Sequence, residues 1–297
     1  MLPTVTPYTV ARSAPRAARQ VSFQLSRRQG AIYLILILGS VLTLIPFAWT
    51  ILASFKQHAE IVDVVNPTFF PRNFTTDNYT TILSDDTLPL GRFYFNSIAV
   101  ALGNVLTLGF SSSLFGYVFA KFDFRGKRLL FAYILATLMI PFQLTMIPSY
   151  LILLRFDLTN NLLGLIALSW FDAFGIFLMR GFMRNVPDDL LDAARVDGAG
   201  EWQIFLRIAM PQVLPALATY CVFIFIGQWN AYLWPLIVLR DQDVRTLPII
   251  LTWYNQANVS NLGLQMAASV LLVMPILAVY LAMQRWVVQG FTLSGFK

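Results

Sequence analysis

Long apolar runs are the feature that most constrains what this chain can fold into. The first run extends from Ala31 to Ile51 and contains no charged side chain over 21 residues. A helix needs about 20 such residues to cross the hydrocarbon core of a bilayer. Of the 297 residues, 57% are hydrophobic and 12% are charged, and this charged fraction is about half of that usual in soluble domains. We therefore expect an all-α polytopic membrane protein.

Further apolar stretches follow the first run, and together they predict six transmembrane helices within residues 31–284. The other five stretches are Phe93–Ala120, Leu129–Leu154, Leu162–Met179, Gln212–Leu239 and Leu264–Gln284. Prolines inside a helix remove a backbone hydrogen bond and favour a kink. We therefore expect kinks at four positions in these spans: Pro141, Pro148, Pro235 and Pro275.

The first 30 residues carry five arginines and no acidic residue. This composition predicts a flexible basic tail at residues 1–30. A signal peptide is the alternative, but the run Ala31–Ile51 is longer than its apolar core region and no small-residue cleavage site follows it. We therefore expect this run to remain as an uncleaved first span.

The basic residues are distributed unequally between the two sides of the predicted bundle. The tail 1–30, the loops 121–128 and 180–207 and the C-terminal tail 285–297 together hold 15 of the 21 Lys and Arg residues, whereas the opposite side holds 6. Cytoplasmic segments of membrane proteins carry the excess of Lys and Arg. The count predicts that both termini and the loop near 184–211 lie in the cytoplasm.

The loop at about 184–211 is a polar stretch in an otherwise apolar chain. Pro187 can start a short helix because its missing N–H is not needed there. The helix dipole favours the negative charges of Asp188 and Asp189 in the first turn. An apolar face is expected from three further residues, Leu190, Leu191 and Ala194.

The same loop contains signals for a chain reversal. Gly198 and Gly200 permit a turn with positive φ, and a second short helix can run from Glu201 until Pro211 interrupts it. Together with the first short helix, these residues predict a helix–turn–helix between two membrane spans.

The spacing of Asp192-Ala193-Ala194, Gly198, Ile208 and Pro211 is similar to the "EAA" signature of permease subunits in binding-protein-dependent ABC importers. The chain departs from this pattern at Asp192, where the family has Glu, and at Met210, where it has Leu. The resemblance covers nearly the whole chain after residue 25 and is strongest to the carbohydrate branch, which includes the shorter permease of the maltose and glycerol-3-phosphate systems. Further matching segments are Phe95-Asn96-Ser97, Met139-Ile140-Pro141, Trp229-Asn230, Thr246-Leu247-Pro248 and Gly295-Phe296-Lys297.

The resemblance implies an ABC-importer permease fold in a prokaryotic inner membrane. It also implies that the loop is the coupling helix, which docks in a cleft of a cytoplasmic ATPase. The coupling residues would be Asp192, Ala193, Ala194, Asp197, Gly198 and Pro211. The implied partners are a second, longer permease, two ATP-binding subunits and an extracytoplasmic solute-binding protein. The implied function is the translocation subunit of an ATP-driven importer for a sugar or related polyol.

The sequence itself contains no pattern for catalysis. There is no G-x-x-x-x-G-K-[ST] phosphate-binding loop, so another chain must bind ATP. Cys221 and His58 are the single cysteine and histidine, which excludes a disulfide within the chain and gives no metal-ligand pattern. We expect a permease that is not an enzyme, with no cofactor, no metal and no nucleic-acid partner.

Asp172 is the acid expected well inside a span, and intramembrane acids are functional candidates by default. It could line the translocation path and accept hydrogen bonds from a hydroxylated solute, or it could be a hydrogen-bonding partner between helices. Trp229 and Asn230 are further path candidates, since Trp can stack on sugar faces. Buried packing of Trp and hydrogen bonds between helices through Asn are the alternatives.

Two other classes of function compete with the importer. An ATP-independent secondary transporter or channel would show inverted repeats and several coupling-ion acids in mid-membrane, but we find no convincing repeat and only Asp172. A membrane scaffold or sensor would not depend on an ATPase. An ATPase subunit retained in mild detergent would favour the importer over both.

Overall fold

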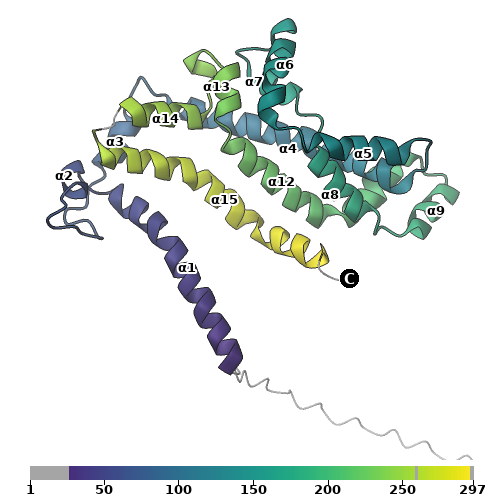
Figure 1. The fold of residues 1–297 in the computed structure, drawn as a ribbon, viewed down its shortest axis with the longest axis horizontal. Helices are drawn as coiled ribbons and strands as arrows, with labels where there is room; N and C mark the ends of the chain where they lie inside the picture. Colours follow the sequence, from purple (N-terminus) through teal and green to yellow (C-terminus); the bar gives the residue numbers. More distant parts are fainter. Residues whose placement is uncertain (1–26, 258–259, 295–297) are drawn as a thin grey trace, which may run out of the picture. The chain divides into compact units, whose positions relative to one another are not determined.

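A computed structural model describes residues 27–257 and 260–294. Within these residues the chain forms helices and no β-strand (Figure 1), which confirms the all-α prediction. The chain divides into two compact units, Met1–Phe47 and Ala48–Lys297. The predicted tail at residues 1–30 lies mostly outside the described residues.

Helix α1 (Arg27–Ala53) begins in the first unit. Its apolar side chains from Ile32 to Ile45 are exposed in that unit, as a helix surrounded by lipid requires. Its length and composition suit a membrane span at Gln29–Ala53, which agrees with the first predicted span.

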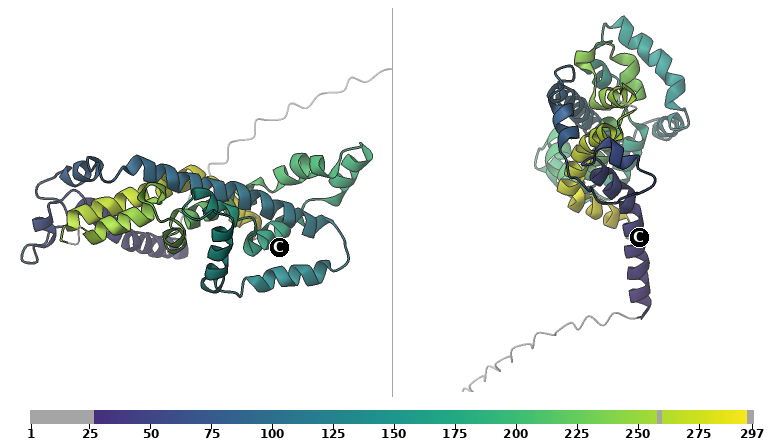
Figure 2. Two further views of the ribbon diagram at one scale, coloured as in Figure 1. Left: turned by 90° about the horizontal axis from the view of Figure 1, so that it is seen from above. Right: turned by 90° about the vertical axis from the view of Figure 1, so that its left-hand side faces the viewer.

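Helix α4 (Leu90–Lys121) is the central element of the second unit. It packs against α7 (Leu162–Ala167), α8 (Ala173–Met183) and α12 (Leu214–Trp229), and α12 packs in turn against α15 (Leu262–Ser294). Figures 1 and 2 show these long helices running side by side. The second and sixth predicted spans are therefore confirmed as the long helices α4 and α15.

Small residues allow α4 and α8 to approach closely. A Cβ added to Gly116 would lie 2.7 Å from the Cβ of Met179 and 2.8 Å from the backbone nitrogen of Arg180. Membrane helices commonly pack through such small residues because no hydrophobic force from water drives them together. This packing fixes the face that α8 presents to the rest of the bundle.

Three of the predicted spans are not continuous helices in the structure, and the predicted count of six transmembrane helices is not confirmed. The stretch Leu129–Leu154 forms α5 (Lys127–Thr137) and α6 (Phe142–Arg155), which meet at 98°. Pro141 stands immediately before α6 with an extended ψ of 137°, and a proline also disfavours helical geometry in the residue before it. The expected kink is therefore a complete break.

The fourth and fifth predicted spans are also interrupted. The stretch Leu162–Met179 is divided between α7 and α8, and Gln212–Leu239 is divided between α12 and α13 (Leu233–Val238). By length and composition, three described helices can each cross a membrane, or up to five spans form if each of two bent pairs counts as one. Pro148 and Pro275, by contrast, lie inside α6 and α15.

Two packed clusters hold the second unit together. One joins α4, α12 and α15 with α14 (Leu247–Ala257) and surrounds the fully buried Trp229. The other joins the far end of α4 to α8 and to the predicted coupling loop, with Tyr117 and Phe205 at its centre. The loop is thus packed onto the bundle through apolar contacts.

The segment after α1 is ordered around a buried lysine. Lys56 is fully buried, and its ammonium donates to the backbone oxygen and hydroxyl of Thr68 and lies 3.7 Å from Glu60. It also lies 4.7 Å from the ring centre of Trp49. The segment includes two short helices, α2 (His58–Ile61) and α3 (Asp77–Leu83).

Candidate functional site

The predicted coupling loop forms two short helices at one end of the second unit. Helix α9 (Asp188–Val196) follows Pro187, which occupies the capping position rather than the first helical position expected from the sequence. The ammonium of Lys121, at the end of α4, donates to the carboxylate of Asp188 at 2.7 Å. This hydrogen bond and the lysine charge hold the pKa of Asp188 below its ordinary value.

Gly198 follows the end of α9 and adopts the left-handed backbone conformation, as predicted. Its φ is 84°, its N–H donates to the carbonyl of Arg195, and the N–H of Ala199 donates to the carbonyl of Ala194. These two bonds define a Schellman motif, in which glycine is preferred because it adopts this conformation without strain. Gly200 has a φ of −71°, so the prediction of positive φ was wrong there.

Arg195 ties the two short helices together. Its guanidinium donates to Asp192 at 2.6 Å and to Glu201 at 2.7 Å, and these hydrogen bonds raise the pKa of Arg195 further above its ordinary value. Glu201, the first residue of α10 (Glu201–Ile204), also accepts a hydrogen bond from the hydroxyl of Tyr117 on α4. The turn is therefore connected to α4, the central helix of the second unit, through side-chain hydrogen bonds.

The two alanines predicted to act in coupling lie on different faces of α9. Leu191 and Ala194 are buried against the chain's own cluster, whereas Ala193 and Val196 are exposed, Val196 to 86%. Leu190 is also exposed, so the predicted apolar face is narrower than expected. Because Ala194 faces inward, its small side chain serves packing within the chain, and an outer partner can contact Ala193 but not Ala194.

The second short helix does not end at Pro211, and the predicted interruption there was wrong. A π-helical turn at Phe205–Ala209 precedes α11 (Met210–Gln212), and Met210 N–H bonds to the carbonyl of Phe205. The wider turn accommodates the proline ring and its missing N–H. The chain bends at Val213 instead, by 82° between the segment Glu201–Gln212 and α12.

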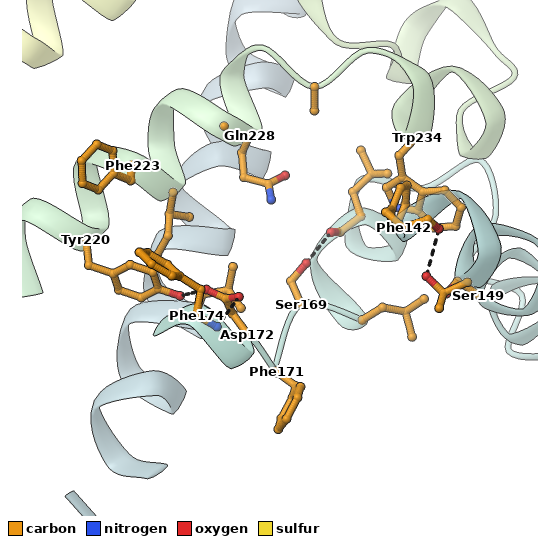
Figure 3. Close-up of a pocket in the computed structure, with 17 residues that line it drawn as sticks. Phe142, Ser149, Ser169, Phe171, Asp172, Phe174, Tyr220, Phe223, Gln228 and Trp234 are labelled. Carbon is orange, nitrogen blue, oxygen red and sulfur yellow. Dashed lines mark hydrogen bonds between the residues drawn. The ribbon is translucent and has the colours of Figure 1, made fainter. Parts of the chain in front are cut away.

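A cavity of about 630 Å³ lies where the interrupted helices meet. The break between α7 and α8 borders it, as do the start of α6 and the end of α12 (Figure 3). Membrane transporters commonly place their solute sites at such breaks, because irregular backbone is tolerated where it lines a cavity. The polar lining residues are Thr145, Ser149, Ser169, Asp172, Tyr220 and Gln228.

Asp172 lies in the break between α7 and α8, and its carboxylate accepts three hydrogen bonds. Its carboxylate caps α8 by accepting from the N–H groups of Phe174 and Gly175, and it accepts from the hydroxyl of Tyr220 at 2.5 Å. Figure 3 shows the Tyr220 hydroxyl pointing at this carboxylate, while the amide of Gln228 extends into the same space. Both roles considered for Asp172 thus have a geometric basis, because it bonds other elements and also lines the cavity.

The structure does not bring Trp229 and Asn230 to the cavity lining. Trp229 is fully buried, its indole N–H donates to the carbonyl of Leu272, and its ring stacks on Phe225. Asn230 ends α12 and donates back to the carbonyl of Ile226. Trp229 therefore serves the core and Asn230 serves the end of its own helix.

Tyr220 and Gly175 are site residues that the sequence analysis missed. A Cβ on Gly175 would lie 2.0 Å from the hydroxyl oxygen of Tyr220 and 2.4 Å from the hydroxyl oxygen of Ser112. A tyrosine inside an apolar run gives no signal of its own. The contact appears only once α4, α8 and α12 are packed together.

Residues 27–257 and 260–294 contain no group of three or more His, Cys, Asp or Glu side chains that could hold an ion. The chemistry available at the cavity is therefore hydrogen bonding, aromatic contact and the charge of one carboxylate.

Comparison with known proteins identifies the family. Residues 112–293 match the family described as binding-protein-dependent transport system inner membrane component. The arabinooligosaccharides transport system permease protein AraQ of Bacillus subtilis is 31% identical over 268 residues, covering 90% of this chain and 95% of the relative. The lactose transport system permease protein LacG of Rhizobium radiobacter is 35% identical over 259 residues, covering 87% and 93%.

Solved structures show the same architecture. A crystal structure of a bacterial ABC transporter involved in the import of the acidic polysaccharide alginate contains a chain with a TM-score of 0.73 and 25% identity, covering 92% of this chain and 99% of that one. A chain of the alginate transporter crystallised with its alginate pentasaccharide-bound periplasmic protein has a TM-score of 0.62 at 13% identity, which shows the fold alone. This chain therefore belongs to the family of binding-protein-dependent transport system inner membrane components, the permease subunits of ABC importers.

Proposed function

We propose that this chain is the translocation subunit of an ATP-driven importer for an uncharged sugar or related polyol. The observation that carries the proposal is the α9–α10 turn, which is packed and hydrogen-bonded to the bundle on one face and leaves Ala193 and Val196 exposed on the other. The exposed face of α9 is thus available to a partner, while the opposite face is occupied by the chain's own cluster. In a permease of this family, a cytoplasmic ATPase is the partner that such a turn suits.

The geometry supports a mechanical role for the turn. Force applied to the exposed face of α9 would pass to α4 through Tyr117 and Lys121, because both side chains bond residues of the loop. ATP binding that closes two ATPase subunits would then move the helices as rigid bodies between two states. Asp192 and Gly198 maintain the turn through the bond to Arg195 and the left-handed φ, and Asp197 contributes its backbone N–H, which donates to the carbonyl of Ala193. Pro211 belongs to the helix that follows.

The cavity supports a hydroxylated, uncharged solute. Among the described residues that line it, Asp172 is the single carboxylate and none is Lys, Arg or His. Hydroxyl groups of a sugar can donate to this carboxylate and to Gln228, and aromatic rings such as Trp234 can cover sugar faces. A phosphate or uronate solute would meet the negative charge of Asp172 without a compensating cation, so we expect such solutes to be disfavoured.

The remaining partners follow from the proposed role. A second, longer permease would face the open side of the cavity, two ATP-binding subunits would supply hydrolysis, and an extracytoplasmic solute-binding protein would deliver the sugar. The relatives whose names specify arabinooligosaccharides and lactose are consistent with sugar as the solute class. Both termini and the α9–α10 turn would lie in the cytoplasm.

Reconstitution tests the proposal directly. The chain would be co-expressed with its partner subunits, placed in liposomes and supplied with the binding protein, whose ligand is first found by thermal-shift screening against neutral sugars, uronates and glycerol phosphates. We expect uptake of a neutral sugar that requires ATP. Uptake that continues without ATP, or driven by an ion gradient, would support the secondary transporter instead.

The orientation needs its own experiment. Single cysteines at Gln203 and Asn66, both exposed, would be placed in a Cys221→Ser background and labelled with a reagent that cannot cross the membrane. Only the Asn66 variant should react in intact cells. Labelling of the Gln203 variant from outside would exclude a cytoplasmic ATPase as the partner of α9.

A further inference from the structure

A second hollow, of about 380 Å³, lies between α5 and α8 and plays no part in the proposed solute path. Arg128, Phe131, Ala132 and Leu135 line it from α5, and Arg180 lines it from α8. The spacing of the four α5 residues places them on one face of that helix. We call this hollow the α5–α8 groove.

The charged end of the groove carries uncompensated positive charge. The guanidinium of Arg180 is half-buried, donates to the carbonyl of Phe119 and lies 4.1 Å from the ring centre of Phe131. Among the described residues, neither Arg180 nor Arg128 has an ion-pair partner. Lys127 also lines the groove and pairs with Asp123 at 3.0 Å, but that carboxylate is fully exposed.

The groove changes from charged to apolar along α5. From Arg128 to Leu135 the helix rises about 10 Å, and the lining passes from guanidinium groups through Phe131 to the small and apolar Ala132 and Leu135. The neighbouring α5 side chains Leu129 and Tyr133 are exposed. This gradient matches a molecule with an anionic head and a hydrocarbon chain.

The charged end also lies at the correct level of the bundle. Lys121, which precedes α5 by six residues, bonds Asp188 of the coupling loop, so the start of α5 and α9 lie at the same end of the second unit. On the proposed function this end faces the cytoplasm. Basic pockets between membrane helices on that side are suited to lipid headgroups.

We propose that the α5–α8 groove binds an anionic phospholipid of the cytoplasmic leaflet, with its phosphate between Arg128 and Arg180 and one acyl chain along Ala132 and Leu135. Phe131 holds the Arg180 guanidinium in place from the other side. The bound lipid then fixes α5 against α8, the helix that begins at Asp172.

Native mass spectrometry tests this binding on the full complex. The complex is purified in a non-ionic detergent, stripped of lipid, and given equal concentrations of phosphatidylglycerol or phosphatidylcholine. We expect one tightly held phosphatidylglycerol per copy of this chain and at least tenfold weaker binding of phosphatidylcholine. Equal binding of the two lipids would overturn the proposal. Glycerol phosphate has the anion without the acyl chains, so the proposal would also be overturned if it displaced the bound phosphatidylglycerol as effectively as free phosphatidylglycerol does.

Matched variants locate the site. A single surface cation contributes about fivefold to the affinity for an anionic membrane. Arg180→Gln and Arg128→Gln should therefore each lower the affinity for phosphatidylglycerol by fivefold or more. Arg125→Gln is the control, because Arg125 lies in the turn just before α5 but does not line the groove. Equal loss in all three variants would show a general surface potential and would contradict the proposal.

Arg180 also bonds Phe119 and packs on Phe131, so Arg180→Gln can disturb the assembly of the complex. Two further variants test lipid binding without altering Arg180. Asp123→Asn removes the only carboxylate that lines the groove among the described residues, so it should tighten phosphatidylglycerol binding. Ala132→Trp should fill the apolar part and weaken lipid binding without any change of charge. If neither variant alters binding, the lipid lies elsewhere, whereas uptake and ATP dependence in the same complexes report separately on the proposed function.

Discussion

The hydroxyl of Tyr220 donates to the carboxylate of Asp172 at 2.5 Å and so joins the middle of α12 to the first residue before α8. Ser112 of α4 lies 3.1 Å from the same hydroxyl. Three helices therefore meet at one polar contact beside the cavity. The carboxylate is held in a fixed position, and it remains part of the cavity lining.

Substitutions of Asp172 should separate its charge from its capping role. Asn also caps helices well, whereas loss of a cap to Ala costs about 1 kcal/mol. We expect Asp172→Asn to assemble normally and keep basal ATPase activity but to transport sugar more slowly, and Asp172→Ala to lower the thermal unfolding midpoint of the complex as well. If Asp172→Asn prevents assembly, the carboxylate is structural and the solute-contact role is excluded.

Gly175 should tolerate no larger side chain. In Gly175→Ala the new Cβ would collide with the Tyr220 and Ser112 hydroxyls, and overpacking of this kind costs about 1–3 kcal/mol. We expect a lower unfolding midpoint and loss of transport. Gly181→Ala is the matched control, since it lies on the same helix with nothing within 4 Å, and it should unfold at or above the wild-type temperature. Equal midpoints in the two variants would contradict the packing shown here.

Gly198 should be sensitive to backbone conformation and insensitive to size. A Cβ there meets no atom within 4 Å, but a residue other than Gly in the left-handed region costs about 1–2 kcal/mol. We expect Gly198→Val to remain in the membrane and to lose the stimulation of ATP hydrolysis by the loaded binding protein. Gly198→Asn should retain most of it, because Asn enters this region more easily. Full stimulation in Gly198→Val would contradict the coupling role.

Tryptophan substitutions at Ala193 and Ala194 should cause different defects. Ala193→Trp adds bulk to the exposed face, so we expect it to reduce the amount of ATPase that co-purifies while the permease keeps its unfolding midpoint. Ala194→Trp adds bulk to the buried face, so it should lower that midpoint directly. The pair is measured by thermal unfolding and by quantifying the retained ATPase. A reversed pattern would mean that α9 docks by its other face.

The segment ordered by Lys56 should loosen in acid. Burial alone would raise the pKa of Glu60, but hydrogen bonds from Arg72 and Thr68 and the charge of Lys56 bring it below its ordinary value of 4.5. A carboxylate with a depressed pKa stabilises the folded state above its unfolded pKa, and this stability is lost as the pH falls through the folded value. We therefore expect the segment to remain ordered at pH 5 and to lose this stabilisation progressively as the pH falls below 4.5 and through the lower pKa of the folded state.

Hydrogen exchange at the Arg72 amide, corrected for its intrinsic pH dependence, measures this opening. Glu60→Gln is the control, and its exchange should be faster throughout and show no transition near the same pH. A transition of the same size in the variant would assign the effect to Asp63, which pairs with Arg72 at 3.4 Å and whose pKa is also lowered.

Local rules predicted the reversal between the two short helices of the loop at 184–211, but not its capping residue or its end, and they predicted the membrane helices unevenly. The conformational freedom of glycine predicted the reversal at Gly198, because a positive φ is determined mainly by the residue itself and its immediate neighbours in sequence. Composition identified α4 and α15, but the same apolar composition continues through the breaks before Pro141, at Asp172 and after Trp229. Hydropathy averages over such breaks, and the side chains that stabilise them, such as Tyr220, come from other helices. The cavity was therefore beyond sequence reasoning, although one of its residues was named.

The length of α4 has a mechanical consequence. Its 32 residues extend about 48 Å, well beyond the roughly 30 Å of the hydrocarbon core. One end bonds the coupling loop through Tyr117 and Lys121. Near the other end, the side-chain amide of Asn96 donates to the carbonyls of Asp243 and Arg245, in the loop before α14.

On the proposed function, such a rod would act as a lever pivoted within the bilayer. A tilt of about 10° about its midpoint would carry each end roughly 4 Å in opposite directions, given its length. A push on the loop at one water-exposed surface would thus be delivered, reversed in direction, to the residues around Asn96 at the other.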